Sequence, residues 1–551
     1  MREAGVLNSK IENIPLWLAI LPLIVLISLL GLNVWLYGDS ATYGANQIAL
    51  IMAAAIAVLI GQYLRVPFVK ILEGMVASLN SSIVAMLILL LIGALSGTWM
   101  ISGIVPAMIY YGLKILTPET FLVASLIVCS IVSVATGSSW TTVATVGVAL
   151  IAIGNALGLN PAMTAGAIIS GAYFGDKISP LSDTTNLAPA MAGTDVFTHV
   201  RYMLYTTVPT YIITVAVFWI LSLNLNLQTT EASAETLLAM IEAKFMISPF
   251  LFAVPALVVI MVLMKFDALS ALFVAMILGA VVAIIFQPQV INELAVEVNK
   301  KLGSPTSESG TIAANSPTIG SPSETKQTEP DKQQSWFRYS LNAYNSVVNA
   351  MSIATALSPD EAKIRGIFVE KGYPEEKVNA LMVQLQANPK NADLFKSKGM
   401  TGMLSTIWLV FCAMCFGGAM EAIGLLERIT LPLVRMAQST GSLIGTTVAS
   451  CVLVNIAAAD QYLAIVVPGR MFRKTFEDRG LAPENLSRTL EDAGTVTSVL
   501  VPWNTCGATQ AGVLQVPTLH YLPYCVFNYV SPLMTVFFGA FQIAIRRRLE
   551  K

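Results

Sequence analysis

Charged residues are scarce in this chain. Asp, Glu, Lys and Arg make up only 12% of its 551 residues, whereas a typical soluble domain carries about 25%. The formal net charge is −1, so the chain offers no basic surface for a nucleic acid. Apolar residues account for 55% of the sequence and the mean hydropathy is +0.70. Most of the chain must therefore face lipid or other buried helices, and we predict an all-α polytopic membrane protein.

Groups that carry out catalysis are also scarce. The two histidines, His199 and His520, lie far apart in the sequence, so neither a transition-metal cluster nor a histidine-based nucleophile is expected. No phosphate-binding loop is present, which argues against a nucleotide-driven pump. All six cysteines lie in apolar runs, and we interpret the Cys412–Cys415 pair as packing residues on one helical face rather than a redox or metal site. We therefore predict neither an enzyme nor a resident cofactor.

Long apolar runs are abundant, and a membrane span needs about 20 such residues. The clear runs are 15–37, 47–64, 82–112, 120–136, 202–223, 247–264, 267–286, 401–426, 429–456 and 520–545. The first is too long for a signal-peptide core and lacks a small-residue cleavage pattern, so we expect a retained span. Further apolar segments, interrupted by Gly, Pro and hydroxyl residues, are 138–157, 162–190, 461–475 and 490–515. Backbone can leave a helix at membrane depth only where protein or water satisfies its polar groups, so we predict broken or re-entrant helices there.

The sequence is duplicated at an offset of 322 residues. Without gaps, this offset aligns Gly147 with Gly469, Gly158 with Gly480, Leu159 with Leu481, Pro161 with Pro483 and Pro180 with Pro502. Duplicated polar segments that carry Gly and Pro are typical of transporters built from two repeats. In such transporters the binding site lies in broken helices where the repeats meet.

Basic loop residues predict the orientation of the two repeats. The tail from Arg546 and the loop from Arg470 to Arg488 are basic and are expected in the cytoplasm. The matching loop of the first half, 148–166, contains no Lys or Arg and is expected outside. The same motif then faces opposite sides, which predicts inverted-topology repeats meeting near the membrane midplane. Arg2 and Lys10 place the N-terminus inside, so both termini of this multi-pass inner-membrane protein are predicted to be cytoplasmic.

These patterns divide the chain into membrane and soluble parts. The predicted parts are a cytoplasmic N-terminus 1–14, membrane repeat 1 at 15–224, an external linker 225–246, membrane repeat 2 at 247–287 and 401–546, a polar insert 288–400 and a cytoplasmic tail 547–551. The insert has no counterpart in the first half and is predicted to lie outside. Its residues 303–335, rich in Ser, Thr, Pro and Gln, are predicted to be disordered. Residues 359–398 predict two short helices separated by Gly372–Tyr373–Pro374.

Two polar segments of the first repeat carry candidate chemistry. In the segment 137–142, small and hydroxyl residues surround Trp140, which indicates either a helix break or small-residue helix packing. In the segment 171–186, Pro180 cannot sit in an unbroken helix, and Ser182 and Asp183 suit the cap of a helix that restarts there. A cap role alone would explain Asp183. Asp176 lies beside Lys177 at membrane depth, where charge is costly unless it is paired or functional.

The second repeat supplies acids where the first has neutral residues. The offset places Asp460 on Ser138, Asp492 on Ser170 and Thr505 on Asp183. A single asymmetric site can therefore gather carboxylates from both halves. Its oxygen ligands would suit Na⁺, as they suit other hard cations. The predicted binding residues are Asp176, Asp460, Asp492, Asp183, Ser138, Ser139, Thr142, Lys177, Ser182, Thr184, Asn186, Asn504 and Thr505. Asp176 and Asp460 form the predicted core pair for Na⁺, and Lys177 could neutralise the empty site.

The chain resembles the NhaC-type Na⁺/H⁺ antiporter family of the larger ion-transporter superfamily. The resemblance rests on the segments ATGSSWTTVATVGVAL, ISGAYFGDKISPLSDTTNLAPA and VPWNTCGA. The resemblance covers roughly 10–224 and 247–545, whereas the insert departs from the shorter family pattern. It implies a secondary antiporter that lies in the lipid bilayer and exchanges Na⁺ for H⁺ across it. Such an antiporter has a moving transport bundle and a static scaffold.

Other functions remain open at this point. Look-alikes in the family exchange organic acids such as malate and lactate, or amino acids, so a Na⁺- or H⁺-coupled carrier of a small organic anion or amino acid is the alternative. An ion channel or a structural membrane protein fits less well, because a channel does not need buried acids placed asymmetrically in a duplicated fold. The sequence leaves open the stoichiometry, the cation selectivity, the role of the insert and the oligomeric state, and a homodimer is compatible with it.

Overall fold

The computed structural model describes residues 13–115, 117–224, 231–264, 266–301, 332–357, 360–387 and 395–548. Nearly all of these residues are helical. Among them, nine helices are long and apolar enough to cross a membrane, or up to eleven if each of two bent helix pairs counts as one span. The protein is therefore an all-helical polytopic membrane protein, as predicted.

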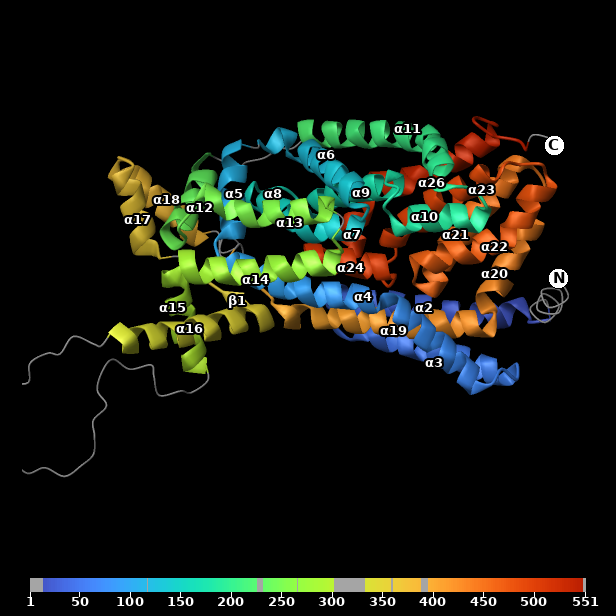
Figure 1. The fold of residues 1–551 in the computed structure, drawn as a ribbon, viewed down its shortest axis with the longest axis horizontal. Coiled ribbons are helices and arrows are strands. Elements are labelled where there is room, and N and C mark those ends of the chain that lie inside the picture. Colours follow the sequence, from blue (N-terminus) through green and yellow to red (C-terminus); the bar gives the residue numbers. More distant parts are fainter. Residues whose placement is uncertain are drawn as a thin grey trace, which may run out of the picture.

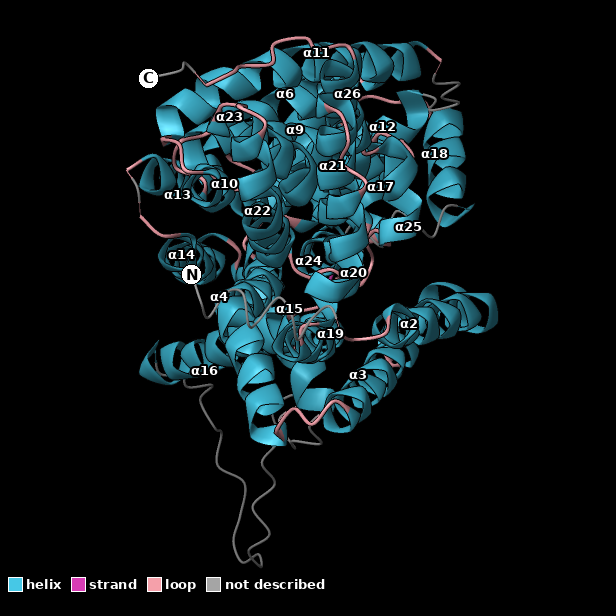
Figure 2. Ribbon diagram, turned by 90° about the vertical axis from the view of Figure 1, so that its right-hand side faces the viewer, coloured by secondary structure: helices cyan, strands magenta, loops and turns pink. Residues whose placement is uncertain are grey.

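The helices form two layers, which are seen one above the other in Figures 1 and 2. The scaffold layer contains α2 (Leu16–Tyr37), α3 (Ala45–Tyr63), α4 (Phe68–Ile101), α14 (Ala268–Phe286) and α19 (Leu404–Ile423). Within it, α19 packs against both α3 and α4. The backbones of α4 and α19 approach closely because glycines meet, and a Cβ on Gly418 would lie 2.6 Å from the carbonyl oxygen of Gly74. Small residues allow this approach between membrane helices.

The second layer, which we call the core bundle, is built from two similar runs of helices. The first run contains α6 (Pro118–Thr136), α7 (Ser139–Thr142), the π-helical turn η2 (Val143–Gly147), α8 (Val148–Ala156), α9 (Pro161–Ile178), α10 (Asp183–Ala192) and α11 (Val196–Leu223). The second run contains α21 (Thr440–Ala458), α22 (Gln461–Asp478), α23 (Pro483–Leu490), the π-helical turn η7 (Glu491–Thr495), η8 (Ser498–Leu500), α24 (Thr505–Leu514), α25 (Thr518–Tyr521), η9 (Leu522–Tyr524) and α26 (Val526–Ala540).

The duplication is visible in the backbone of the core bundle. Left-handed residues recur at the same offset, with φ of 68° at Gly137 and 58° at Ala459, and of 74° at Gly158 and 66° at Gly480. Helix caps recur as well. Ser138 and Asp460 cap the helices after the first break of each repeat, whereas Ser182 and Asn504 cap the helices after the second. The two repeats therefore share their helix ends although their side chains differ.

Some helix boundaries differ from those predicted. The run 82–112 is not one span, because α4 already begins at Phe68 and the chain turns at Gly103 (φ 79°) before α5 (Ile104–Ile115). Polar residues in the first turns of α4 lower the local hydropathy, so the apolar run begins later than the helix does. The run 429–456 is likewise divided between α20 (Leu425–Arg435) and α21, and the Ser439 capping box marks the start of α21. The run 247–264 belongs to a pair, 235–244 and 249–261, bent by 88°.

The insert packs beside the linker between the repeats. Its elements are α15 (Pro288–Lys301), α16 (Lys332–Ser352), β1 (Thr355–Ala356), α17 (Glu361–Glu370), α18 (Glu375–Ala387) and β2 (Lys396–Ser397), followed by η6 (Met400–Met403). The two short helices predicted on either side of residues 372–374 are confirmed as α17 and α18. The predicted disordered segment 303–335 lies mostly outside the described residues, as do residues 1–12 and 549–551. Both short helices contact α12 (Glu231–Lys244), with Lys371 2.7 Å from Glu242 and Lys377 3.1 Å from Glu235, so the insert and the linker pack against each other.

Close packing of α6 on α9 predicts a large difference between two glycines. A Cβ on Gly171 would overlap the carbonyl oxygen of Leu126, whereas a Cβ on Gly445 of α21 would meet nothing within 4 Å. We expect Gly171→Ala to lower the stability by about 1–3 kcal/mol through overpacking. Gly445→Ala should leave it unchanged or raise it slightly, because Ala favours a helix. Thermal unfolding of both variants in detergent measures this, and equal midpoints would contradict the packing of α6 on α9.

Candidate functional site

The second break of the first repeat separates α9 from α10. After α9 ends at Ile178, Ser182 caps α10 by accepting a hydrogen bond from the backbone N–H of Thr185. The hydroxyl of Thr185 donates to the carbonyl oxygens of Asp176 (3.1 Å) and Lys177 (3.0 Å), which lie in the last turn of α9, where carbonyl groups lose helical donors. The break is thus held by short-range hydrogen bonds, and it fixes the position of both charged residues.

Asp176 is held against the first break of the same repeat. Its side chain is 7% exposed, and its Oδ2 accepts hydrogen bonds from the backbone N–H (3.1 Å) and the hydroxyl (2.6 Å) of Ser139. Ser182 also lies within hydrogen-bonding range of this carboxylate. The structure therefore brings together three of the predicted binding residues from both breaks of the repeat.

A row of oxygen atoms continues from Asp176 into the second repeat. The hydroxyls of Ser182 and Thr184 are 3.2 Å apart, and the Thr184 hydroxyl donates to Oε1 of Glu491 at 3.0 Å. Glu491 is fully buried at the start of η7. Glu491 is not among the predicted binding residues, because the offset places it on Ile169 and directs attention to the neighbouring Asp492. Its only sequence signal is that it is a second acid within an apolar segment.

Lys177 forms a buried ion pair with Asp492, and neither side chain is exposed to solvent. The ammonium group of Lys177 also donates to the hydroxyl of Ser531 at 2.9 Å. Asp492 accepts hydrogen bonds from the hydroxyls of Thr206 (2.8 Å) and Thr535. Lys177 is thus paired across the repeats rather than with its neighbour Asp176.

Asp460 occupies the first break of the second repeat. It is 4% exposed and caps α22, with its carboxylate accepting a hydrogen bond from the N–H of Leu463 at 2.9 Å. No hydrogen bond or ion pair of the described structure joins Asp460 to Asp176. Asp183 is exposed at the start of α10, where the hydroxyl of Tyr462 lies 3.4 Å from its carboxylate. The predicted core pair therefore occupies two separate breaks.

The remaining predicted residues stabilise the breaks themselves. Ser138 accepts from the N–H of Thr141, and Thr142 donates to the carbonyl oxygen of Ser138 at 2.9 Å. The Asn186 amide donates to the carbonyls of Pro180 and Ser182, both local contacts. Asn504 donates to Asn455 and caps α24, and the Thr505 hydroxyl contacts its Oδ1 at 3.4 Å.

The arrangement suits a small hard cation by its chemistry. The buried polar row from Ser139 to Glu491 offers only carboxylate and hydroxyl oxygens, the ligand types that such cations prefer. In the described part of the chain, no group of three or more His, Cys, Asp or Glu side chains is placed to hold a resident metal.

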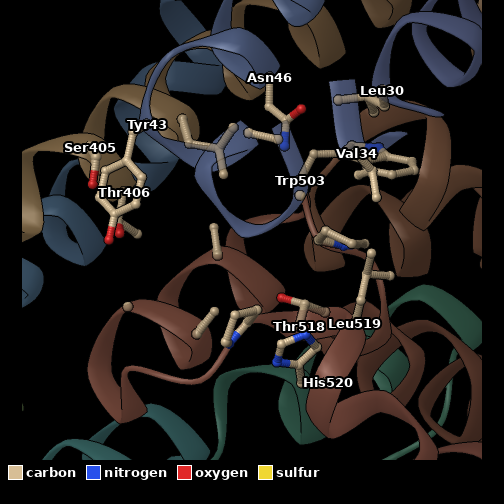
Figure 3. A pocket seen from close by; sticks show the side chains of 18 of the residues that line it. Leu30, Val34, Tyr43, Asn46, Ser405, Thr406, Trp503, Thr518, Leu519 and His520 are labelled. Atoms are coloured by element: carbon tan, nitrogen blue, oxygen red, sulfur yellow. The ribbon is translucent and has the colours of Figure 1, made fainter. Parts of the chain in front are cut away.

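A cavity of about 630 Å³ lies between the scaffold layer and the core bundle. Its wall includes α2, α19, α24 and the loop with Trp503, and Figure 3 shows Leu30, Asn46, Thr406 and Trp503 around it. Trp503 belongs to the second break of repeat 2, next to Asn504. The cavity therefore reaches one of the breaks from the boundary between the two layers.

Comparison with known proteins identifies the family. The sequence profile described as the Na⁺/H⁺ antiporter family matches residues 171–298 and 377–543, which include Asp176, Lys177, Asp460, Glu491 and Asp492. The chain belongs to the NhaC-type Na⁺/H⁺ antiporter family. It is 34% identical to the Na⁺/H⁺ antiporter NhaC of Alkalihalophilus pseudofirmus over 91% of both chains.

Two other relatives of the chain are named as exchangers of organic solutes. The chain is 31% identical to the malate-2H⁺/Na⁺-lactate antiporter of Bacillus subtilis, over 90% of this chain and 88% of the relative. It is 28% identical to the arginine/ornithine antiporter ArcD of Halobacterium salinarum, over 95% and 91%. The protein is therefore a secondary antiporter of a family that includes exchangers of ions and of organic solutes.

The Lys177–Asp492 pair predicts a non-additive response to mutation. Lys177→Met leaves Asp492 charged and unpaired in the bundle, which should cost about 3–5 kcal/mol of stability. The double variant Lys177→Met/Asp492→Asn removes both charges and should recover most of this loss, because Asn can still bond to Thr206 and Thr535. Thermal unfolding in detergent measures both. A double variant no more stable than Lys177→Met would show that the pair does not act as a unit.

Proposed function

We propose that this protein exchanges Na⁺ for H⁺ across the cytoplasmic membrane, with both ions competing for buried carboxylates. The observation that carries the proposal is the setting of Asp176. This carboxylate is buried at a helix break, receives hydrogen bonds from the backbone and the hydroxyl of Ser139, and has no ion-pair partner among the described residues. The basic residue next to it, Lys177, is already engaged by Asp492.

Competition follows from the cost of buried charge. A carboxylate at membrane depth is unfavourable unless a proton or a cation compensates it. Asp176 would then carry one or the other, and the empty charged site would not cross the membrane readily. Asp460 is the second acid at a break, and in this proposal it serves the same cycle from the other repeat. Whichever ion is bound, the site moves with its charge compensated.

The packing of the core bundle supports inverted repeats. Helix α10 packs against α22, and its counterpart α24 packs against η2 and α8, which correspond to α22 in the first repeat. Such an exchange of partners is what a two-fold relation between the repeats produces. The loop 148–166 lacks basic residues while its counterpart carries Arg473 and Lys474, which favours an axis within the membrane plane and cytoplasmic termini.

The two layers support alternating access. In this proposal the core bundle is the moving part and the scaffold layer is static, and the cavity beside Trp503 is an entry route along their boundary. The insert and linker, joined by Lys371 and Glu242, would lie on the external side. Transport would then proceed by displacement of one layer against the other.

A coupled carrier of an organic solute is the second candidate. The cavity of about 630 Å³ falls in the range of about 300–1,000 Å³ usual for small-molecule sites. Trp503 on its wall could pack against an organic solute. The names of two relatives, a malate/lactate antiporter and an arginine/ornithine antiporter, point to such solutes.

Proteoliposomes distinguish the two candidates. For Na⁺/H⁺ exchange, a Na⁺ gradient without any organic solute should drive proton movement, and Asp176→Asn should reduce the rate to background because Asn cannot carry a proton. The control is Asp195→Asn, since Asp195 only caps α11 by accepting from Thr198 and Asn caps equally well. A fluorescent pH indicator in the lumen measures the rate.

Three outcomes are informative. Normal exchange in Asp176→Asn would remove this residue from the mechanism. Loss of exchange in Asp195→Asn as well would show that the assay reports folding rather than transport. A strict requirement for added malate, lactate or an amino acid in the wild type would favour the organic-solute carrier.

Inverted repeats predict opposite accessibility for equivalent loops. Asn155, at the end of α8, and Asp478, at the end of α22, are exposed and lie near the loops related by the offset. A membrane-impermeant thiol reagent added outside intact cells should label Asn155→Cys and leave Asp478→Cys unlabelled. In inside-out vesicles the pattern should reverse. Labelling of both from the same side would contradict inverted topology.

A further inference from the structure

Two neighbouring charged residues of each repeat face one another in the core bundle. Asp176 and Lys177 end α9, and Glu491 and Asp492 begin η7. Successive residues of a helix point in different directions, so the two residues of each repeat take part in two separate contacts. Lys177 pairs with Asp492 in one of them. In the other, the Ser182 and Thr184 hydroxyls connect Asp176 to Glu491.

Glu491 lacks the partners that a buried carboxylate requires. It is fully buried, and only its Oε1 receives a hydrogen bond, from Thr184. Its Oε2 forms no well-aligned hydrogen bond in the described structure. The buried hydroxyl of Thr495 lies within hydrogen-bonding range of the same carboxylate and also lacks a well-aligned bond among the described residues. Buried polar atoms are almost always satisfied, and an unpaired buried carboxylate is far more costly than an unpaired hydroxyl.

Two charged groups, one of each sign, act on the carboxylate of Glu491. Its carboxylate lies within electrostatic range of Asp176, a like charge, and of Lys177. Lys177 does not satisfy it, because its ammonium group contacts Asp492 and Ser531. Glu491 further lies in a π-helical turn, an irregularity that is frequent at functional sites.

We propose that Glu491 is a second carboxylate ligand for transported Na⁺, acting with Asp176, and that the Lys177–Asp492 ion pair positions the two carboxylates. The proposal rests on the function proposed above and adds a ligand to the same site. The ligand set is then formed by oxygens of both repeats, which are the carboxylates of Asp176 and Glu491 and the hydroxyls of Ser182, Thr184 and Thr495. Lys177 and Asp492 are positioning residues, since they touch each other rather than the ion.

Binding of ²²Na⁺ to the purified full-length protein tests the ligand. Glu491→Gln should weaken Na⁺ binding by roughly tenfold or more, because even outer partners of a metal site are worth about 10–100-fold in affinity. Glu484→Gln is the matched control. Glu484 lies on the adjoining helix α23, and its ion-pair partner among the described residues is Arg546, at 3.4 Å. Na⁺ binding by Glu484→Gln should therefore equal that of the wild type.

A second variant keeps the test decisive if Glu491→Gln does not fold. Glu491→Asp keeps the charge but shortens the side chain, and it should bind Na⁺ more weakly than the wild type. Size-exclusion profiles establish that each variant is folded before binding is measured. Wild-type affinity in either folded Glu491 variant would overturn the proposal.

The positioning role predicts a specific kinetic pattern. Lys177→Met/Asp492→Asn removes the ion pair and should raise the KM for Na⁺ severalfold, while the rate at saturating Na⁺ stays close to that of the wild type. Lys177→Arg keeps a positive charge to pair with Asp492, so this variant should have the same KM for Na⁺ as the wild type. If the ion pair were only structural, the folded double variant would have an unchanged KM for Na⁺, and that result would overturn the positioning role.

Failure of this inference can be told apart from failure of the proposed function. If wild-type vesicles show no Na⁺-driven proton movement but Na⁺ binding still depends on Glu491, the inference stands and Na⁺/H⁺ exchange fails. If wild-type exchange is observed and Glu491→Gln binds and exchanges Na⁺ as the wild type does, exchange stands and the inference fails.

Discussion

The Lys177–Asp492 ion pair is the contact on which the arrangement of the core bundle depends. It joins the end of α9 to the start of η7 in a place without solvent, where either charge alone would be strongly unfavourable. Hydroxyls of α11 and α26 complete its hydrogen bonds, so four elements converge on it. Because Asp176 and Glu491 are the chain neighbours of this pair, the contact also fixes how far apart the other two acids can lie.

A duplicated backbone with divergent side chains explains how one site arises from two repeats. The helix ends recur with left-handed residues at Gly137 and Ala459 and with capping residues at Ser138 and Asp460. A backbone break is costly to create in a membrane and is preserved, whereas the residue beside it is free to change. The first repeat contributes Asp176 and Lys177, and the second contributes Glu491 and Asp492. Lys177 pairs with Asp492 across the interface, while the other two acids remain without a basic partner among the described residues.

Much of the fold could be predicted because its signals are local or periodic. Apolar runs gave the membrane class, Pro180 and Ser182 gave a helix break, and the spacing of glycines and prolines gave the duplication. Boundaries failed where helices continue beyond the apolar region, as at the start of α4, or where a cap divides an apolar run, as at Ser439. Hydropathy reports the part of a helix that lies in lipid and not the helix itself.

The site was harder to predict because contact between repeats is not encoded by the offset. The offset selected residues at equivalent positions, and this led to Asp460 as the partner of Asp176. In the structure α10 packs on α22 and α23 of the other repeat and brings Thr184 to Glu491, a residue that the offset does not select. Under the two-fold relation proposed above, a residue faces elements of the other repeat that are not its own counterparts. For a repeat protein of this kind, the duplication therefore predicts where the breaks occur, whereas the packing between repeats determines which acids lie near one another.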